Sequence, residues 1–170
     1  MVVVDTSPCF PGRDILQRLS TYGVQCKYTL LSGVPALLHQ ATKVFIDASY
    51  VLGNGGVVAP TGASMLAYMA SQQRVPVIVF SETYKFTQRV NLDQIKNNQT
   101  LEPILRNPLV DQGERDALVQ KRNLKLCCLK YDYTPIECVQ MIMCEIGRVS
   151  PVSVPVIVSE FNEEKKAEVL

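Results

Sequence analysis

Short β-branched and aliphatic runs alternate with segments of helical periodicity along the first half of this chain, and this alternation restricts the fold more than any other feature. The strand candidates are 2–4, 26–31, 43–48 and 75–80. The helix candidates between them are 13–22, 34–40 and 61–73. Continuous apolar runs are typical of strands buried on both faces, and strands joined by helices run parallel through right-handed crossovers. The sequence therefore predicts an α/β fold with a doubly wound, mostly parallel sheet flanked by helices.

The second half of the chain is less regular. Asparagine, proline and glycine interrupt 91–125, which we interpret as a surface excursion. The elements expected in this half are a short helix at 113–120, a strand at 124–131, a helix at 135–146 and an edge strand at 154–158. Thr134 would cap the start of the longer helix, and Gly147 would follow its end. We expect one domain, 1–159, followed by a charged tail, 160–170.

Composition excludes several classes of protein. With 170 residues, of which 47% are hydrophobic, the chain is long enough for one domain with a core of its own. The net charge of +1 argues against a surface that attracts nucleic acid or membranes over a long range. The sequence has no apolar run of membrane-spanning length. We therefore expect a soluble protein without direct contacts to nucleic acid or membrane.

Cysteine and histidine are present but are not arranged for metal binding. His39 is the one histidine, and no two cysteines have the Cys-x-x-Cys spacing of a zinc site. The six scattered cysteines are Cys9, Cys26, Cys127, Cys128, Cys138 and Cys144. Free thiols in apolar runs indicate a reducing compartment, so we expect a cytoplasmic protein with no metal and no cofactor.

A glycine-rich turn between a strand and a helix is the first candidate for a binding site. Asn54 and Gly55 favour a tight turn because both residue types adopt positive φ readily. The helix after the turn would present free N–H groups to an anion. The candidate ligand-binding residues are Asn54, Gly55, Thr61, Gly62, Ala63 and Ser64. Neither a Gly-x-Gly-x-x-Gly fingerprint nor a P-loop is present, and the alternative is a tight connection that lets helix and sheet pack closely.

The segment after the strand at 75–80 is the second candidate. A carboxylate, a hydroxyl, an ammonium and two aromatic rings follow one another in Glu82-Thr83-Tyr84-Lys85-Phe86. The carboxyl ends of parallel strands hold ligand sites, and exposed aromatic side chains also form protein interfaces. The alternative is that Glu82 and Lys85 pair with each other at the surface.

A third cluster follows the first strand, and the groups for catalysis are few. Asp5 could orient a ligand and Arg13 could clamp a phosphate. The alternative is that Ser7 and Asp14 of this cluster serve only the entry of a helix. His39 lies among apolar residues and fits no Ser-His-Asp set, and no close pair of carboxylates follows a predicted strand. The sequence therefore predicts no catalytic residue.

Several short motifs occur together in one order. They are Val2-Val3-Val4-Asp5, Gly12-Arg13, Tyr22-Gly23-Val24, Thr42-Lys43-Val44-Phe45, Asn54-Gly55 and Glu82-Thr83-Tyr84-Lys85-Phe86. With this order and spacing the chain resembles the regulatory subunits of eukaryotic translation initiation factor 2B. The closing motifs most similar to the delta-type subunits are Tyr131-Asp132-Tyr133-Thr134-Pro135 and Ser153-Val154-Pro155-Val156. The resemblance covers nearly the whole chain, apart from the excursion and the tail.

The resemblance implies a Rossmann-like C-terminal domain, which a helical domain precedes in full-length subunits. It implies a regulatory, non-catalytic role in translation initiation, within the complex that exchanges guanine nucleotide on initiation factor 2. The implied partners are other subunits of the complex, the beta-type subunit most directly, together with initiation factor 2 and its alpha subunit. The implied assembly is a dimer through the Rossmann-like domain. The candidate residues for a subunit interface are Tyr84, Lys85, Phe86 and Arg89.

The fold is also similar to that of methylthioribose-1-phosphate and ribose-1,5-bisphosphate isomerases, which gives a rival hypothesis. Where those enzymes have a proton-transferring aspartate and an Asn-Lys pair, this chain has Ser49 and Ala59-Pro60. A serine with no base beside it does not transfer protons near neutral pH, and Ala59-Pro60 lacks the groups that hold a sugar phosphate. A residual sugar-phosphate or nucleotide sensor stays open as a third hypothesis, because helix N–H groups do not depend on side chains.

Overall fold

The computed structural model describes residues 1–7, 10–88, 121, 123–124 and 127–167. Its helices and strands are β1 (Val2–Asp5), α1 (Gly12–Thr21), β2 (Lys27–Leu30), α2 (Val34–Leu37), β3 (Val44–Asp47), β4 (Tyr50–Leu52), β5 (Val57–Pro60), α3 (Ala63–Gln72), β6 (Val77–Phe80), β7 (Phe86–Thr87), β8 (Tyr131–Thr134), β9 (Met141–Cys144), β10 (Gly147–Val149) and α7 (Val154–Ala167). The strands and helices predicted within the first 80 residues are all present.

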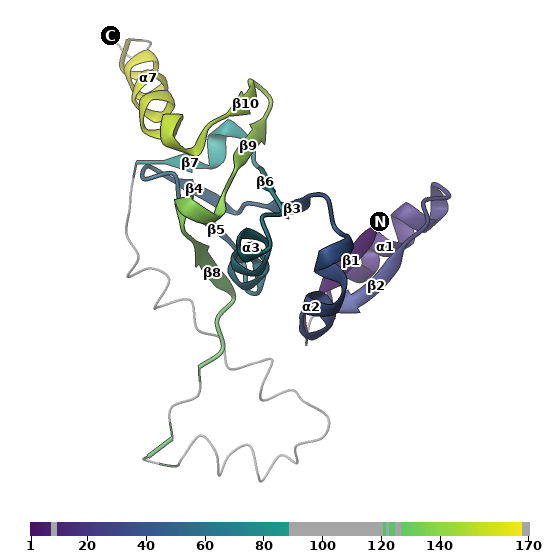
Figure 1. The fold of residues 1–170 in the computed structure, drawn as a ribbon. Helices are drawn as coiled ribbons and strands as arrows, with labels where there is room; N and C mark the ends of the chain where they lie inside the picture. The colour runs from purple at the N-terminus through teal and green to yellow at the C-terminus, as the bar shows by residue number, and fades with distance from the viewer. Residues whose placement is uncertain (8–9, 89–120, 122, 125–126, 168–170) are drawn as a thin grey trace.

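The strands of the described residues form three sheets (Figure 1). β1 and β2 form a parallel pair, and β3, β6 and β9 lie parallel in a second sheet whose edge strand, β10, is antiparallel. The third sheet, in the order β7-β4-β5-β8, pairs β4 with β7 in parallel and is otherwise antiparallel. The predicted α/β class with flanking helices and mainly parallel strand pairs is therefore confirmed.

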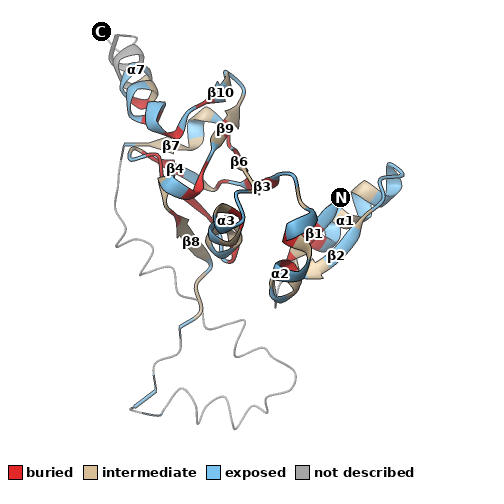
Figure 2. Ribbon diagram, in the orientation of Figure 1, coloured by how far each residue is buried: buried red, intermediate tan, exposed pale blue. Residues whose placement is uncertain are grey.

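The core is one cluster of buried residues from the second sheet, α3, the β4 and β5 strands and α7 (Figure 2). Alternate residues of the second sheet belong to this core: Val44 and Ile46 of β3, Val77 and Val79 of β6, and Ile142 of β9 are buried. α3 contributes alanines, which let the helix approach the sheet closely. The packing fixes the direction of β3 and β6, whose carboxyl ends meet at Asp47 and Phe80.

The helix predicted at 135–146 is wrong. A short 3-10 turn, Ile136–Cys138, is followed by β9, which pairs with the edge of β6 and places Ile142 opposite Val79. The apolar residues of this segment fit either period, and pairing with an open strand edge decides for the strand. Gly147, expected after a helix, instead has a φ of +114° where β9 turns into β10.

The edge strand predicted at 154–158 is also wrong. Val154 and Val158 are buried residues on one face of α7, four positions apart, as one helix face requires. The backbone of α7 continues to Ala167, so the domain limit expected at 159 falls within a helix. The strand expected at 124–131 begins only at Tyr131, and the helix expected at 113–120 lies outside the described residues. Thr134, expected as a helix cap, is the last residue of β8.

Thr134 gives a prediction about stability. Its Oγ1 is buried and has no hydrogen-bond partner in the described part of the chain. Because valine has the same shape without the hydroxyl, Thr134→Val should raise the free energy of unfolding by about 1 kcal/mol in urea denaturation. The matched variant Thr61→Val removes a hydroxyl that donates to the Leu129 carbonyl at 2.6 Å, and it should lower the free energy instead. Equal losses in both variants would contradict this account.

Candidate functional site

The glycine-rich turn is the tip of a β-hairpin that the sequence did not predict. β4 and β5 pair antiparallel on either side of it, and the amide of Leu52 donates to the Gly56 carbonyl at 2.8 Å. The amide of Gly55 donates back to the Leu52 carbonyl at 2.8 Å, and Gly55 has a φ of +78°. This is the geometry of a tight hairpin with one left-handed residue, in which glycine is favoured. A hairpin therefore separates the strand β3 from the helix α3, where a ligand-binding loop was expected.

Asn54 and Gly55 lie against the C-terminal part of the chain. The Asn54 amide donates to the Tyr133 hydroxyl at 3.1 Å, and its Oδ1 accepts the Gly56 amide at 3.0 Å. A Cβ on Gly55 would lie 2.5 Å from the Pro151 carbonyl oxygen, closer than any side chain allows. The contacts of these two residues dock the hairpin onto β8 and onto the segment before α7.

Thr61, Gly62, Ala63 and Ser64 lie at the other end of β5, at the start of α3. Two of the free amides of this helix end already have an acceptor, the carboxylate of Asp132 on β8. The Gly62 amide donates to Asp132 Oδ2 at 2.7 Å, and the Ser64 amide lies 3.2 Å from each carboxylate oxygen. The six candidate ligand residues therefore lie in two separate parts of the structure, the tip of the β4–β5 hairpin and the start of α3. At the start of α3, the Asp132 carboxylate accepts the helix amides.

Asp132 was not predicted as a functional residue. Burial raises the pKa of Asp132 above its ordinary value, and the hydrogen bonds from Gly62 and Ser64 offset only part of that effect. Asp132 reaches α3 because β8 pairs with β5, which places it opposite Ala59. The sequence motif contained the residue, but only the strand pairing shows which helix it meets.

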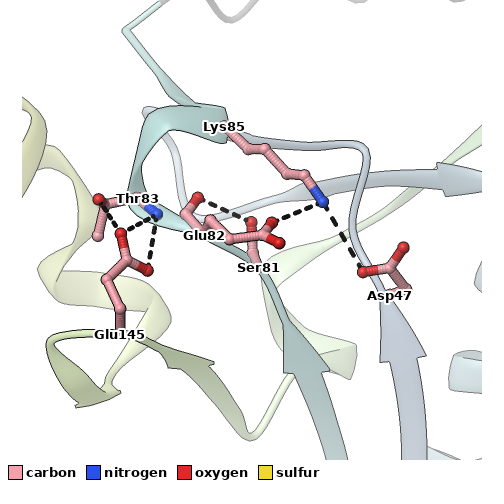
Figure 3. A network of polar contacts seen from close by, with 6 residues as sticks. All are labelled: Asp47, Ser81, Glu82, Thr83, Lys85 and Glu145. Atoms are coloured by element: carbon pink, nitrogen blue, oxygen red, sulfur yellow. Dashed lines mark hydrogen bonds and ion pairs between the residues drawn. The ribbon is translucent and has the colours of Figure 1, made fainter.

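The second candidate segment forms a polar network at the carboxyl ends of β3 and β6 (Figure 3). Lys85 Nζ lies 2.7 Å from Glu82 Oε2 and 3.9 Å from Asp47 Oδ1. The hydrogen bond to Glu82 raises the pKa of Lys85, which keeps the ammonium charged. The pairing of Glu82 with Lys85, the alternative stated from the sequence, is therefore confirmed.

Glu145 binds Thr83 on the other side of this network (Figure 3). Its carboxylate, which follows β9, accepts the Thr83 amide at 2.9 and 3.1 Å and also accepts the Thr83 hydroxyl. These hydrogen bonds lower the pKa of Glu145. Glu145 was missed because its segment was interpreted as the end of a helix.

The four candidate interface residues differ in their exposure and contacts. Tyr84 is the exposed one, with 79% of its surface accessible. The Lys85 side chain is held by its ion pairs, and Phe86 on β7 packs against the core. Arg89 lies outside the described residues. Tyr84 is therefore the aromatic ring in this group that is free to meet another protein.

Asp5 forms a buried polar contact at the end of β1. Its carboxylate accepts the Tyr28 hydroxyl at 2.7 Å and the Thr6 amide at 2.8 Å, and 2% of the residue is accessible. Burial raises the pKa of Asp5, but the hydrogen bonds from Tyr28, Gly12 and Thr6 outweigh it and leave the pKa below its ordinary value. The Arg13 guanidinium lies 4.7 Å from the centre of the Phe10 ring.

Ser49 and His39 each have a local hydrogen-bond partner in the described structure. Ser49 donates its amide to the Val58 carbonyl in the hairpin, and His39 is an exposed residue paired with Gln40. No group of three or more acidic, cysteine or histidine side chains is placed to hold a metal ion in the described ranges. Cys26, Cys127, Cys128, Cys138 and Cys144 are free thiols. None of the described helices is both long and apolar enough to span a membrane.

Comparison with known proteins gives one family. Residues 1–151 match the Initiation factor 2 subunit family. The translation initiation factor eIF2B subunit delta of Dictyostelium discoideum is 40% identical in an alignment 169 residues long, which covers 96% of this chain and 27% of that protein. The subunit of the same name from Schizosaccharomyces pombe is 33% identical over 96% of this chain and 36% of its own length. The chain thus spans about a quarter to a third of these relatives.

More distant similarities include an enzyme and two solved structures. Ribose 1,5-bisphosphate isomerase of Pyrococcus furiosus is 25% identical over 95% of this chain and 49% of the enzyme. The translation initiation factor eIF-2B of Pyrococcus horikoshii OT3 superposes with a TM-score of 0.68 at 21% identity, over 88% of this chain and 48% of the other. The tetrameric eIF2B-beta2-delta2 complex of C. thermophilum gives a TM-score of 0.65 at 20% identity, over 94% and 45%. The structural similarities confirm the fold.

Proposed function

The chain belongs to the Initiation factor 2 subunit family, and from this premise we propose that it is a non-catalytic regulatory and assembly domain of a delta-type subunit of eIF2B. The observation that carries the proposal is the 40% identity to a delta subunit over 96% of this chain, compared with 25% to an isomerase. In this role the domain acts in translation initiation, in the cytoplasm, as part of the complex that exchanges guanine nucleotide on initiation factor 2.

The geometry of the candidate site supports a non-catalytic role. In the isomerases that the sequence resembles, an aspartate transfers protons and an Asn-Lys pair holds the phosphate. Ser49, Ala59 and Pro60 occupy these positions here, and all three belong to the β4–β5 hairpin or its entry. Lys85, the cation at the carboxyl ends of β3 and β6, is already bonded to Glu82. A proton-transferring base and a free cation for phosphate are both needed for this chemistry.

An isomerase assay tests the non-catalytic part of the proposal. We expect no conversion of methylthioribose-1-phosphate or ribose-1,5-bisphosphate above the uncatalysed rate by the full-length protein. Turnover that disappears in a Ser49→Ala variant would instead establish the isomerase hypothesis, for which the 25% identity to ribose 1,5-bisphosphate isomerase is the supporting observation.

The partner proposed for this domain is a beta-type subunit of the same complex. The C. thermophilum complex is a tetramer of two beta and two delta subunits, and the present chain has the fold found in that complex. We further propose that initiation factor 2, including its alpha subunit, contacts the assembled complex. A dimer through this domain, with Tyr84 in the interface, is the arrangement that the exposed ring favours.

Tyr84 gives a prediction about assembly. Tyr84→Asp should weaken binding to a beta-type subunit by roughly tenfold or more, because it places a charge where the proposed interface would bury an aromatic ring. The matched control is Tyr22→Asp, which changes an equally exposed tyrosine at the end of α1, where 83% of the residue is accessible. The affinities are measured by titration of the labelled beta-type subunit. Equal affinities of the two variants would exclude Tyr84 from the interface.

A further inference from the structure

One face of the second sheet carries apolar side chains that remain accessible to solvent. Ile46, Val79 and Ile142 belong to the core, and side chains alternate between the two faces of a strand, so the residues beside them project from the opposite face. The ring centres of Phe45 and Phe80 lie 5.5 Å apart there, and these residues are 49% and 43% exposed. Contiguous apolar surface of this kind marks an interaction site. We call this surface the outer face, and its apolar members are Phe45, Ile78, Phe80, Met141 and Met143.

Strand pairing arranges the outer face in two rows that run across the sheet. Residues that are paired between neighbouring strands lie on the same face, about 5 Å apart. One row, from β9 to β3, contains Met141, Ile78 and Phe45. The other row, from β10 to β3, contains Arg148, Met143, Phe80 and Asp47. The second row therefore has a cation at one end, an anion at the other end and two apolar side chains between them.

Both charged ends of this row are available to a partner. Arg148 is exposed, and no ion pair joins it to another described residue. The Asp47 side chain is 80% accessible, and its ion pair with Lys85 Nζ is long, at 3.9 Å. That ammonium lies closer to Glu82, at 2.7 Å (Figure 3). Asp47 can therefore accept a second cation from outside the chain.

The order of the charges restricts what can cover the outer face. A surface of a single sign, such as an anionic membrane or a nucleic acid, would meet Asp47 as well as Arg148 and would gain nothing from the pair. A second copy of the outer face, turned about a two-fold axis parallel to the strands, brings the β10 edge of one copy over the β3 edge of the other. Arg148 of each copy then meets Asp47 of the other, and the apolar rows pack between two aligned sheets. A two-fold axis across the strands would instead place like charges together, which is unfavourable.

We propose that the outer face is an interface between two copies of this chain, related by a two-fold axis parallel to its strands. The contact is isologous, so the pair of Asp47 with Arg148 occurs twice. The apolar rows supply the affinity because the contact removes the exposed phenylalanine rings from water, and the charged ends set the orientation. This inference goes beyond the proposed function, because it concerns two copies of this chain and needs no beta-type subunit.

Charge reversal tests the proposal through the mass of the full chain alone. Sedimentation equilibrium of the wild type at micromolar to submillimolar concentration should show a monomer–dimer equilibrium. Asp47→Arg and Arg148→Asp should each raise the Kd of the dimer by roughly tenfold or more, because like charges then meet at two symmetric places. An equimolar mixture of the two variants should recover the dimer, since one variant has only cations at these ends and the other only anions. The matched control Arg18→Asp reverses an exposed charge on α1 and should leave the Kd unchanged.

Three results would overturn the proposal. They are a wild type that stays monomeric over the whole range, single variants that dimerise with the wild-type Kd, and a mixture in which the two variants do not pair. Far-UV circular dichroism shows whether each variant is folded. If a reversal does not fold, Asp47→Asn and Arg148→Gln replace the two variants and should each weaken the dimer by a smaller factor, and an unchanged Kd in both would contradict the proposal. Binding to a beta-type subunit is measured separately, so failure of this proposal is distinguishable from failure of the proposed function.

Discussion

Gly62→Ala is expected to lower the free energy of unfolding by about 2–4 kcal/mol, measured by urea denaturation of the full chain. Two costs add at this position. Gly62 has a φ of +105°, which alanine adopts only with strain. The new methyl group would also lie 2.8 Å from the methyl of Thr6 and 3.1 Å from Leu31, so the end of β1 and the start of α3 would have to move apart.

Gly147→Ala separates these two costs. Gly147 has a similar φ, +114°, but no atom of the described residues, apart from its chain neighbours, lies within 4 Å of the place where its Cβ would be. The free energy of unfolding of Gly147→Ala should therefore fall only by the part that backbone strain causes, about 1–2 kcal/mol. If both variants lost the same amount, the close contact of Gly62 with Thr6 and Leu31 would contribute nothing to stability, and the packing described at the start of α3 would be wrong.

Asp5→Ala is expected to lower the free energy of unfolding by about 2–3 kcal/mol at neutral pH, also measured by urea denaturation. The carboxylate is buried and accepts hydrogen bonds from Tyr28, Gly12 and Thr6, and the variant would leave these donors without their charged acceptor. Asp5→Asn keeps the shape and removes the charge, so it should lose less than Asp5→Ala. The control Asp14→Ala, an exposed carboxylate on α1, should change the free energy by less than about 0.5 kcal/mol.

The effect of Asp5 should depend on pH in one direction. The folded pKa of Asp5 lies below its ordinary value of 3.8, so the folded state binds a proton on this group less tightly than the unfolded state does. The stabilisation by the charged carboxylate is therefore complete above the unfolded pKa and is lost as the pH falls through the folded pKa. The difference between wild type and Asp5→Asn should shrink on acidification, and a difference that grows would show that the pKa shift has the opposite sign.

The first half of the fold follows from local sequence because its strands are short, continuous apolar runs. Val44 and Ile46 of β3 and Val77 and Val79 of β6 are buried, as the strand prediction requires. The expected burial on both faces is wrong, because Phe45 and Phe80 on the other face of these strands are 49% and 43% exposed. The helix α3 has apolar residues at helical spacing, so its limits are also close to the prediction. In these segments local preference and tertiary packing favour the same structure.

The secondary structure of the later segments was predicted wrongly because tertiary contacts determine it. The apolar residues of 139–144 fit a helix as well as a strand, and the open edge of β6 selects the strand. Val154 and Val158 are compatible with a strand by composition, but both are buried on one face of α7. The hairpin of β4 and β5 was not predicted because the glycines between the two strands indicate only a turn.

The sequence predicted where the candidate site lies, but it did not predict two of the side chains that form it. The sequence located the helix start at Thr61–Ser64 and the polar segment after β6. It did not locate Asp132 or Glu145, because each acts on a segment more than 60 positions away, namely 70 for Asp132 with Gly62 and 62 for Glu145 with Thr83. Side chains that reach across sheets become visible only when strand pairing is known.

The mass of the assembly formed with a beta-type subunit tests the central claim most directly. The purified full chain and a beta-type eIF2B subunit are mixed at micromolar concentration, and native mass spectrometry or light scattering gives the mass of the species formed. We expect a complex that contains both chains in equal number. A chain that stays a monomer in the presence of the beta-type subunit, while its far-UV spectrum shows that it is folded, would contradict the claim that this domain is an assembly module of eIF2B.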